Sequence, residues 1–201
     1  MKLYITPTSP YGRIIRMVVH EKGLAGRVEI VTAETRKAGS PYYAVNPSGR
    51  VPYLVRDDSA PIEDSQLIAH YLDSLDGKPR LTLPFATQDW AYGRLETYAR
   101  SMLDGIAVYL RETRRPETER SPTILAHEQA RAVRLADFWE REVGHALMQG
   151  PINMAQMLLV TAFDTGAACR IADLESGRPK LAVWLRRARD LAPVKATARV
   201  E

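Results

Sequence analysis

Hydrophobic and polar residues alternate at the start of the chain, where Leu3 and Ile5 stand between polar neighbours. This period of two predicts a short β-strand. Apolar residues then recur at helical spacing from Tyr11 to Val19, which predicts an amphipathic helix. A second strand is expected over residues 28–32. Because crossover connections within one sheet are right-handed, the two strands should be parallel.

The following stretch predicts a hairpin and a second helix. Residues 33–50 are rich in polar and turn-forming types and are expected to be irregular. Residues 53–56 and 60–63 have the composition of two strands joined by a tight turn. A capped amphipathic helix should follow over residues 65–75. The order of elements in this part is therefore β-α-β-β-β-α.

From about residue 86 onward the hydrophobic periodicity is helical only. One segment, residues 154–171, is apolar almost all the way round, which is typical of the central helix of a bundle. Asn153 and Gln156 stand at the cap and N3 positions of a capping box at its start. The other expected helices are 86–113, 123–148 and one that opens at Pro179.

The chain therefore divides into two domains of different class. The prediction is an α/β domain with a mixed sheet over residues 1–76, a linker over 77–84 and an all-α domain over 85–201. No internal repeat is visible.

The composition is that of a soluble globular protein. The chain has 201 residues, of which 45% are hydrophobic and 26% charged, and no apolar run is long enough to span a bilayer. The single cysteine, Cys169, excludes an intrachain disulfide framework. The four histidines form no cluster with metal-ligand spacing, so no metal is expected. With no secretory signal at the N-terminus, a cytoplasmic location is expected.

The charge is modestly basic, at +4, but the basic residues alternate with acids. The densest basic run, residues 111–120, mixes arginine with glutamate around Pro116 and is typical of a solvated turn between helices. Neither nucleic acid nor a membrane is therefore expected as a partner.

Three short motifs contain residues with chemical potential. Ser9 precedes Pro10 at the expected start of the first helix. A serine there is either a plain helix cap or a hydroxyl that donates to an anion bound at the helix N-terminus. It lacks the nearby base or elbow motif that a serine nucleophile needs.

The second motif runs from Asn46 to Tyr53 and has a proline on either side of Gly49, which predicts a rigid turn that leads into a sheet edge. The third contains Asp64 and Ser65 at a helix start. These two residues are either caps or a site for a ligand that carries an ammonium group and a carboxylate.

The order of these motifs resembles the cytosolic glutathione S-transferase family, in its serine-type, bacterial-like form. The resemblance rests on S-P-Y-G-R-I-I-R at 9–16, N-P-S-G-R-V-P-Y-L at 46–54, E-D-S-Q-L-I-A-H-Y-L at 63–72 and an all-α second half. It implies a thioredoxin-like first domain that binds glutathione and a helical second domain that supplies much of the electrophile pocket.

The resemblance also implies roles for individual residues. Ser9 matches the catalytic serine, whereas the position that other classes fill with tyrosine is Ile5 here. Val51 matches the residue whose backbone pairs with the cysteinyl part of glutathione, and Pro52 matches a cis-proline. The remaining glutathione-binding candidates are Asp64 and Ser65 for the γ-glutamyl end and Arg50, with Lys37 second, for the glycyl carboxylate.

The implied activity is transfer of the glutathione thiolate to a small, apolar electrophile, as in detoxification. By position, the pocket would be lined by Tyr11, Met102, Ile106 and Tyr109, although these residues equally fit the core of a helical bundle. Glutathione would be a cosubstrate and no cofactor is implied, and a homodimer is typical of the family. The alternatives are a glutathione-dependent isomerase, dehalogenase or peroxidase, and a relative that binds glutathione or a protein without catalysis.

Overall fold

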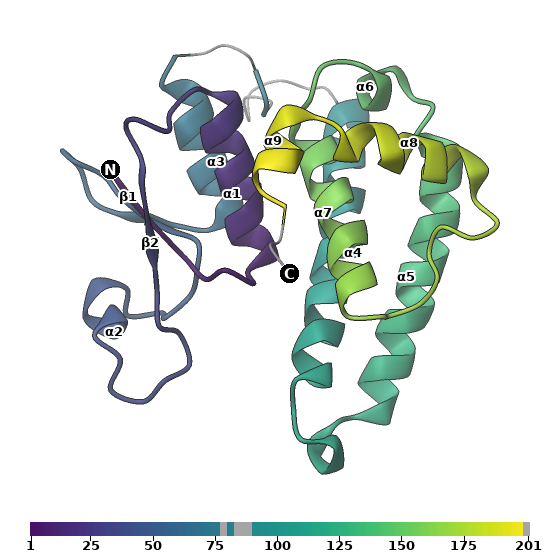
Figure 1. Ribbon diagram of the computed structural model, residues 1–201, viewed down its shortest axis with the longest axis horizontal. Helices are drawn as coiled ribbons and strands as arrows, with labels where there is room; N and C mark the ends of the chain where they lie inside the picture. The colour runs from purple at the N-terminus through teal and green to yellow at the C-terminus, as the bar shows by residue number, and fades with distance from the viewer. Residues whose placement is uncertain (77–79, 83–89, 199–201) are drawn as a thin grey trace. The chain divides into compact units, whose positions relative to one another are not determined.

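The computed structural model describes residues 1–76, 80–82 and 90–198, and the chain forms two compact units (Figure 1). One unit comprises Met1–Pro84 together with Ala192–Glu201, and the other comprises Phe85–Leu191. The first contains the sheet and the second is helical. Most of the expected linker lies outside the described residues. The C-terminal segment, expected in the helical domain, groups with the sheet-containing unit instead.

A four-stranded mixed sheet forms the centre of the first unit, with strand order β2-β1-β3-β4. β1 (Lys2–Ile5) pairs in parallel with β2 (Glu29–Thr32) and antiparallel with β3 (Tyr53–Val55). β4 (Ile62–Glu63) completes the sheet as the antiparallel partner of β3. The predicted parallel pair and hairpin are confirmed.

Two helices pack side by side on one face of this sheet: α1 (Pro10–Glu21) and α3 (Ser65–Ser74) (Figure 1). Leu3 and Ile5 are buried on that face because alternate residues of a strand point the same way. A Cβ at Gly12 would lie 3.0 Å from the Ile5 side chain, so α1 lies very close to β1. The short helix α9 (Ala192–Ala196) also contacts α1.

On the opposite face of the sheet lies Tyr42 of α2 (Tyr42–Val45), a single turn of helix within the stretch expected to be irregular. Tyr42 is buried in a cluster with Ala33 and Tyr53, against which Tyr4 also packs. Tyr4 therefore points away from α1, as its register one residue from Ile5 requires.

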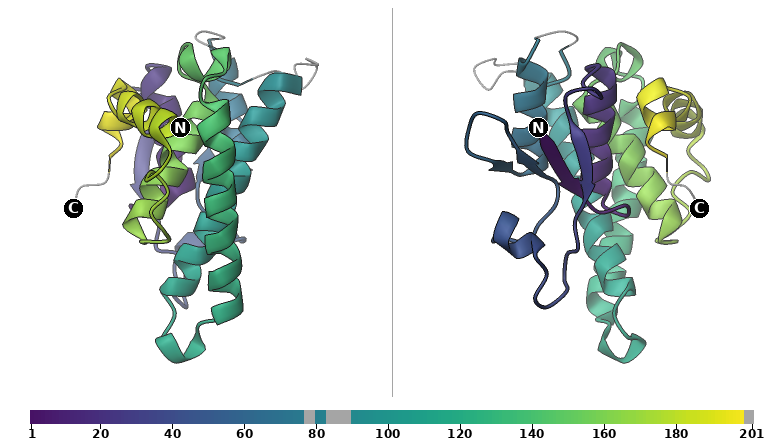
Figure 2. Two further views of the ribbon diagram at one scale, coloured as in Figure 1. Left: turned by 90° about the vertical axis from the view of Figure 1, so that its right-hand side faces the viewer. Right: turned by 60° about the vertical axis from the view of Figure 1, so that its left-hand side comes forward.

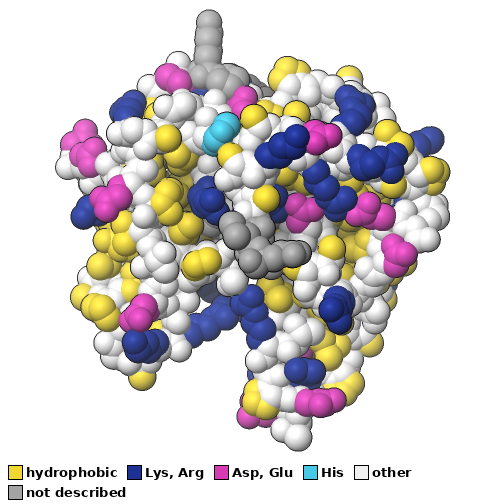
Figure 3. All heavy atoms as spheres, in the orientation of Figure 1, with side chains coloured by type: hydrophobic (Ala, Val, Ile, Leu, Met, Phe, Trp, Pro, Cys, Tyr) yellow, Lys and Arg dark blue, Asp and Glu magenta, His cyan; other side chains and the backbone are white. Residues whose placement is uncertain are grey.

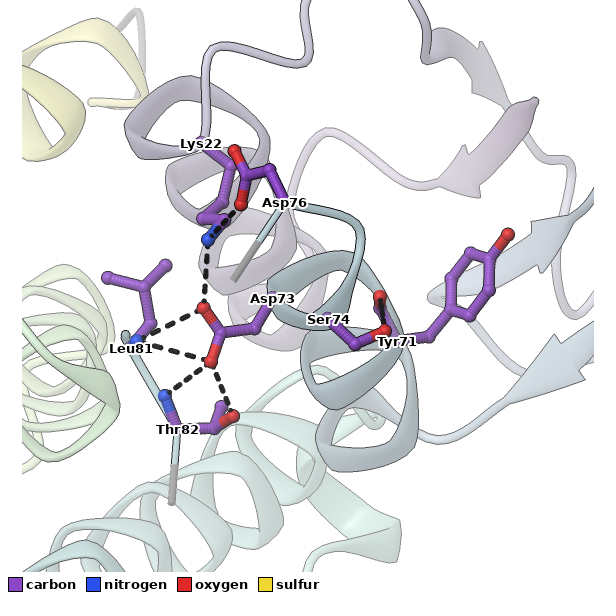
Figure 4. Close-up of polar contacts among 7 residues, drawn as sticks. All are labelled: Lys22, Tyr71, Asp73, Ser74, Asp76, Leu81 and Thr82. Atoms are coloured by element: carbon purple, nitrogen blue, oxygen red, sulfur yellow. Dashed lines mark hydrogen bonds and ion pairs between the residues drawn. The ribbon is translucent and has the colours of Figure 1, made fainter. Parts of the chain in front are cut away.

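A buried ion pair joins the end of α1 to the end of α3, and hydrogen bonds connect it to the segment that follows α3 (Figure 4). The Lys22 ammonium lies 3.1 Å from the Asp73 carboxylate and 2.6 Å from that of Asp76. Asp73 also accepts hydrogen bonds from the backbone amides of Leu81 and Thr82 and from the Thr82 hydroxyl. These bonds fix the end of the first unit before the chain enters the helical one.

The second unit is a helical bundle around α7 (Met154–Ala168), which contacts α4 (Trp90–Thr113) and α8 (Pro179–Arg189). Figure 2 shows α4 running alongside α5 (Pro122–Glu142), with the short helix η1 (Glu117–Glu119) at the turn between them. Most of α7 is buried, which confirms it as the central helix. No helix of the described residues is both long and apolar enough to cross a membrane.

Two predicted helix boundaries are wrong. The helix expected over 123–148 is interrupted, because α5 ends at Glu142 and His145 caps a separate turn, α6 (Ala146–Gln149), through its ring nitrogen Nδ1. The helix expected to reach residue 171 ends at Ala168, since Arg170 adopts a left-handed conformation with φ of 53°.

The cap of α7 is only partly the expected capping box. The side-chain oxygen of Asn153 accepts the Gln156 amide at 3.1 Å, as expected for a cap. The Gln156 side chain instead donates to backbone carbonyls of the preceding loop, at Leu147, Gly150 and Pro151. Gln156 therefore fixes the loop that leads into the helix.

Candidate functional site

The sheet topology brings the three sequence motifs to one edge of the first unit. β1 and β3 are antiparallel, with Tyr4 opposite Tyr53, so β1 ends where β3 begins. β4 ends at the same edge, because Glu63 pairs with Tyr53. The loop that contains Ser9, the turn before β3 and the Asp64-Ser65 pair therefore share this edge. The N-termini of α1 and α3, which carry partial positive charge, begin there too.

Ser9 is the N-cap of α1. Its hydroxyl oxygen accepts the backbone amide of Gly12 at 3.0 Å, and Pro10 follows in the first turn. Ser9 is therefore a helix cap, as one of the two interpretations predicted. A hydroxyl has one donor and two acceptor positions, and this bond uses only an acceptor. The Ser9 proton can still be donated to an anion at the helix N-terminus.

The turn before β3 contains a cis peptide bond between Val51 and Pro52, as the resemblance implied. The Arg50 carbonyl oxygen accepts hydrogen bonds from the Tyr42 hydroxyl at 2.5 Å and from the Asn46 side chain at 3.0 Å. Within the described residues, no group of the protein pairs with the amide N–H of Val51. A backbone donor at the edge of the site thus remains available for an extended peptide ligand.

Side chains that the sequence analysis gave no role hold this turn in place. The Glu63 carboxylate accepts hydrogen bonds from the Asn46 amide, at 2.8 Å, and from the Ser48 hydroxyl. Asn46 is almost fully buried. Burial raises the pKa of the Tyr42 phenol; the hydrogen bond from Asn46 lowers it in part, and the charge of Glu63 raises it further. The only signal for this network in the sequence was the turn composition around Gly49.

Asp64 and Ser65 lie at the start of α3. Asp64 is the N-cap, with a positive φ of 80°, and its Oδ1 accepts the amides of Gln66 and Leu67 at 2.7 and 3.3 Å. Ser65 is buried, whereas the Asp64 side chain is exposed. The second carboxylate oxygen of Asp64 takes no part in these two bonds, and the exposed side chain carries a negative charge.

The two basic candidates differ in their surroundings. Arg50 is exposed next to Val51. Lys37 lies in the loop after β2 and its ammonium contacts both carboxylate oxygens of Glu34, at 3.1 and 3.2 Å. Lys37 therefore already has a counter-charge, and Arg50 is the better placed of the two to meet a carboxylate.

The residues expected to line the electrophile pocket fall into two groups. Met102 and Ile106 on α4 are 1% and 0% exposed, the burial that the alternative interpretation as bundle core requires. Tyr11 in the first unit and Tyr109 in the second are half-buried. The two tyrosines are the members of the set with side-chain surface that can touch a ligand.

The second unit has a separate, largely apolar hollow of about 410 Å³ between the end of α5 and α8. Trp184, Val183 and Arg187 line it, and none of the expected pocket residues does. Figure 3 shows lysine and arginine side chains gathered over α8, with acidic side chains among them. The arginines at the two ends of α8 are paired: Arg178 contacts Asp137, and Arg189 contacts Asp164 and Glu175.

The described residues contain no group of three or more histidine, cysteine, aspartate or glutamate side chains that could hold a metal ion. The chemistry of the edge is therefore that of hydroxyls, backbone amides, one exposed carboxylate and two helix N-termini.

Comparison with known proteins shows what the first unit is similar to. Residues 8–75, which contain all three motifs, match the model of the glutathione S-transferase N-terminal domain. This part of the chain is therefore similar to the N-terminal domain of glutathione S-transferases. The chain is 26% identical over 163 residues to the uncharacterized GST-like protein YibF of Escherichia coli, an alignment that covers 81% of this chain and 80% of that protein.

Glutathione S-transferase 2 of Saccharomyces cerevisiae is 32% identical over 113 residues, 54% of this chain and 48% of that protein. Among solved structures, a glutathione S-transferase from Methylobacillus flagellatus with glutathione bound has a TM-score of 0.86 at 24% identity and covers 99% of both chains. The likeness over the whole length confirms the predicted fold, a thioredoxin-like domain followed by a helical one.

Proposed function

We propose that this chain is a serine-type glutathione transferase that joins the thiolate of glutathione to a small, apolar electrophile. The observation that carries the proposal is the convergence of Ser9, Val51 and the Asp64-Ser65 pair at one sheet edge, where two helices begin. Solved relatives from Methylobacillus flagellatus and Pseudomonas fluorescens contain bound glutathione, which supports the same ligand here.

Each group at the edge matches one part of glutathione. The Asp64 carboxylate pairs with the γ-glutamyl ammonium, while Ser65 and the amides of α3 receive the adjacent carboxylate. The Val51 backbone binds the cysteinyl part as an added strand, next to the cis-Pro52. Arg50 approaches the glycyl carboxylate. Glutathione acts as cosubstrate and this scheme requires no metal or prosthetic group.

Ser9 stabilises the thiolate. Its hydroxyl donates to the sulfur anion while its oxygen remains the cap of α1, and the partial positive charge of the helix N-terminus adds to the effect. A downward shift of about 2 units in the thiol pKa corresponds to about 2.7 kcal/mol of preferential binding of the anion. The thiolate then attacks the electrophile.

We further propose that the enzyme acts in the cytoplasm, in detoxification, and that it is a homodimer. An isomerase, dehalogenase or peroxidase would use the same thiolate with a different second substrate, and a non-catalytic relative would bind glutathione or a protein without forming the thiolate.

Steady-state turnover of 1-chloro-2,4-dinitrobenzene with glutathione tests the proposal. Ser9→Ala should lower kcat at least tenfold while the Kd for glutathione changes little. Ser121→Ala is the matched control, because Ser121 caps α5 through the same bond to the third residue after it and is also followed by proline. Equal kcat values for the wild type and Ser9→Ala would contradict the role of Ser9. Glutathione binding without turnover of any electrophile would favour the non-catalytic relative.

A further inference from the structure

Two hydrogen bonds determine the orientation of a single peptide unit in the turn before β3. The Arg50 carbonyl oxygen accepts one bond from the Tyr42 hydroxyl and one from the Asn46 side-chain amide. The Arg50 carbonyl and the Val51 N–H belong to the same planar trans peptide unit, in which they point in opposite directions. The groups that bind the Arg50 carbonyl oxygen therefore also determine the direction of the Val51 N–H.

We propose that Tyr42 and Asn46 are positioning residues of the glutathione site, which act through the Arg50 carbonyl to direct the Val51 N–H at the cysteinyl carbonyl of glutathione. This inference rests on the proposed function, in which Val51 binds that part of the ligand. In the described residues the Val51 N–H has no partner within the protein, so its direction is set from the carbonyl side of the peptide unit.

Tyr42 is itself held rigidly. Its side chain is 4% exposed, and its ring packs against that of Tyr4 with 5.6 Å between centroids. Ala33 and Tyr53 complete the cluster on this face of the sheet. The sheet therefore fixes the position of the Tyr42 oxygen. Because burial raises the pKa of the phenol, the hydroxyl keeps its proton and remains a donor at neutral pH.

Asn46 is fixed by contacts on both ends of its amide group. Its nitrogen donates to Glu63 at 2.8 Å, and its oxygen accepts the Ser48 amide at 3.1 Å. Glu63 is the last residue of β4, and Asp64 and Ser65 follow it directly in the chain. The network thus ties the turn that binds the cysteinyl part of glutathione to the strand that leads to the γ-glutamyl site.

The test compares Tyr42→Phe with Tyr43→Phe by calorimetric titration with glutathione. The two substitutions remove the same hydroxyl from neighbouring residues of α2, but Tyr43 is exposed and no described contact involves its hydroxyl. Loss of one bond to a partly buried acceptor predicts a Kd for glutathione about five- to tenfold higher in Tyr42→Phe. Tyr43→Phe should leave the Kd within twofold of the wild type.

Two further readouts separate positioning from a general effect on stability. In turnover assays Tyr42→Phe should raise the KM for glutathione and leave kcat unchanged, because the Ser9 hydroxyl is untouched. In NMR spectra the Val51 amide resonance should shift on saturation with glutathione in the wild type, and shift less in Tyr42→Phe. A variant that only loses stability would unfold at lower temperature but keep the wild-type Kd and Val51 shift.

The failure of this inference is distinguishable from failure of the proposed function. If the wild type binds glutathione and Tyr42→Phe binds it equally well, the positioning role is wrong and the transferase proposal stands. If the wild-type Val51 amide does not shift, the positioning role and the proposed role of the Val51 backbone are both wrong. If the wild type does not bind glutathione at all, the proposed function is wrong and this inference fails with it.

Discussion

The carboxylate oxygen Oδ1 of Asp64 accepts the amide of Gln66 at 2.7 Å at the start of α3. This bond makes Asp64 a helix cap, while the proposed function requires its negative charge for the γ-glutamyl ammonium. The two roles can be separated, because asparagine is an equally good cap and tolerates the positive φ of this position but carries no charge.

Asp64→Asn should therefore weaken glutathione binding and leave stability nearly unchanged. A lost charge-assisted contact of about 1.5 kcal/mol or more corresponds to a Kd at least about tenfold higher. The control is Asp58→Asn, which makes the same change in net charge in the turn between β3 and β4. Calorimetric titration of both variants would contradict the assignment if their Kd values were equal.

Acid should weaken the first unit through Asp73. Burial raises the pKa of this carboxyl, but hydrogen bonds from Thr82 and Leu81 and the contact with Lys22 outweigh burial, so the pKa lies below the ordinary 3.8. A depressed folded-state pKa contributes stability that is present above the unfolded-state value and is lost as the pH falls through the folded-state value. The free energy of unfolding should therefore decline as the pH falls below about 4.

Asp73→Asn should unfold more readily at neutral pH and show a flatter decline in acid. Asp73→Ala should cost about 3 kcal/mol, since it removes the Asp73 carboxylate from the buried Lys22 ammonium. Urea unfolding at several pH values measures both effects. Parallel pH profiles for the wild type and Asp73→Asn would show that Asp73 is not the titrating group.

Gly49 should tolerate no side chain. Its φ is +66°, and a Cβ there would lie 2.6 Å from Cε1 of the Tyr43 ring. Gly39 has a similar φ of +71° but open space around it. Gly39→Ala should cost about 1 kcal/mol for the backbone alone, and Gly49→Ala about 2 kcal/mol or more because of the added clash. Chemical unfolding of the two variants tests this, and equal losses would mean that the ring moves freely aside.

Gln156 should stabilise the helical unit more through its amide nitrogen than through its oxygen. Gln156→Glu keeps the shape of the side chain but removes the donor that Leu147, Gly150 and Pro151 share. Because the three carbonyls lose their donor and a carboxylate is buried, the free energy of unfolding should fall by about 2 kcal/mol at neutral pH. Because protonation restores a donor, the loss should shrink in acid. A loss that does not depend on pH would contradict this account.

The fold was predictable because its elements carry strong local patterns. The alternation at Leu3 and Ile5, the apolar face of α1 and the all-round apolarity of α7 each point to one structure. The break between α5 and α6 was not predictable, since the periodicity continues through it and only the backbone at Gly144 and the His145 cap interrupt the helix. The return of α9 to the first unit depends on tertiary contacts with α1 that no local pattern encodes.

The sequence motifs predict the residues that the proposed function assigns to glutathione, but not the contacts that hold the turn before β3 in place. Ser9, Val51-Pro52 and Asp64-Ser65 lie in recognisable motifs at the ends of predicted elements. Tyr42 lies in the stretch expected to be irregular and Glu63 at the end of an expected strand, and their partners are 8 and 15 residues away along the chain. Such contacts depend on where the sheet places the turn, so they became visible only in the structure.

The most direct test of the central claim is the pKa of the glutathione thiol when it is bound. Ultraviolet difference absorbance of the thiolate should be followed against pH at saturating glutathione, for the wild type, Ser9→Ala and Ser121→Ala. The account predicts thiolate at neutral pH in the wild type and in Ser121→Ala, and a thiol pKa about 2 units higher in Ser9→Ala. The same thiolate titration in all three proteins, or none in any, would contradict it.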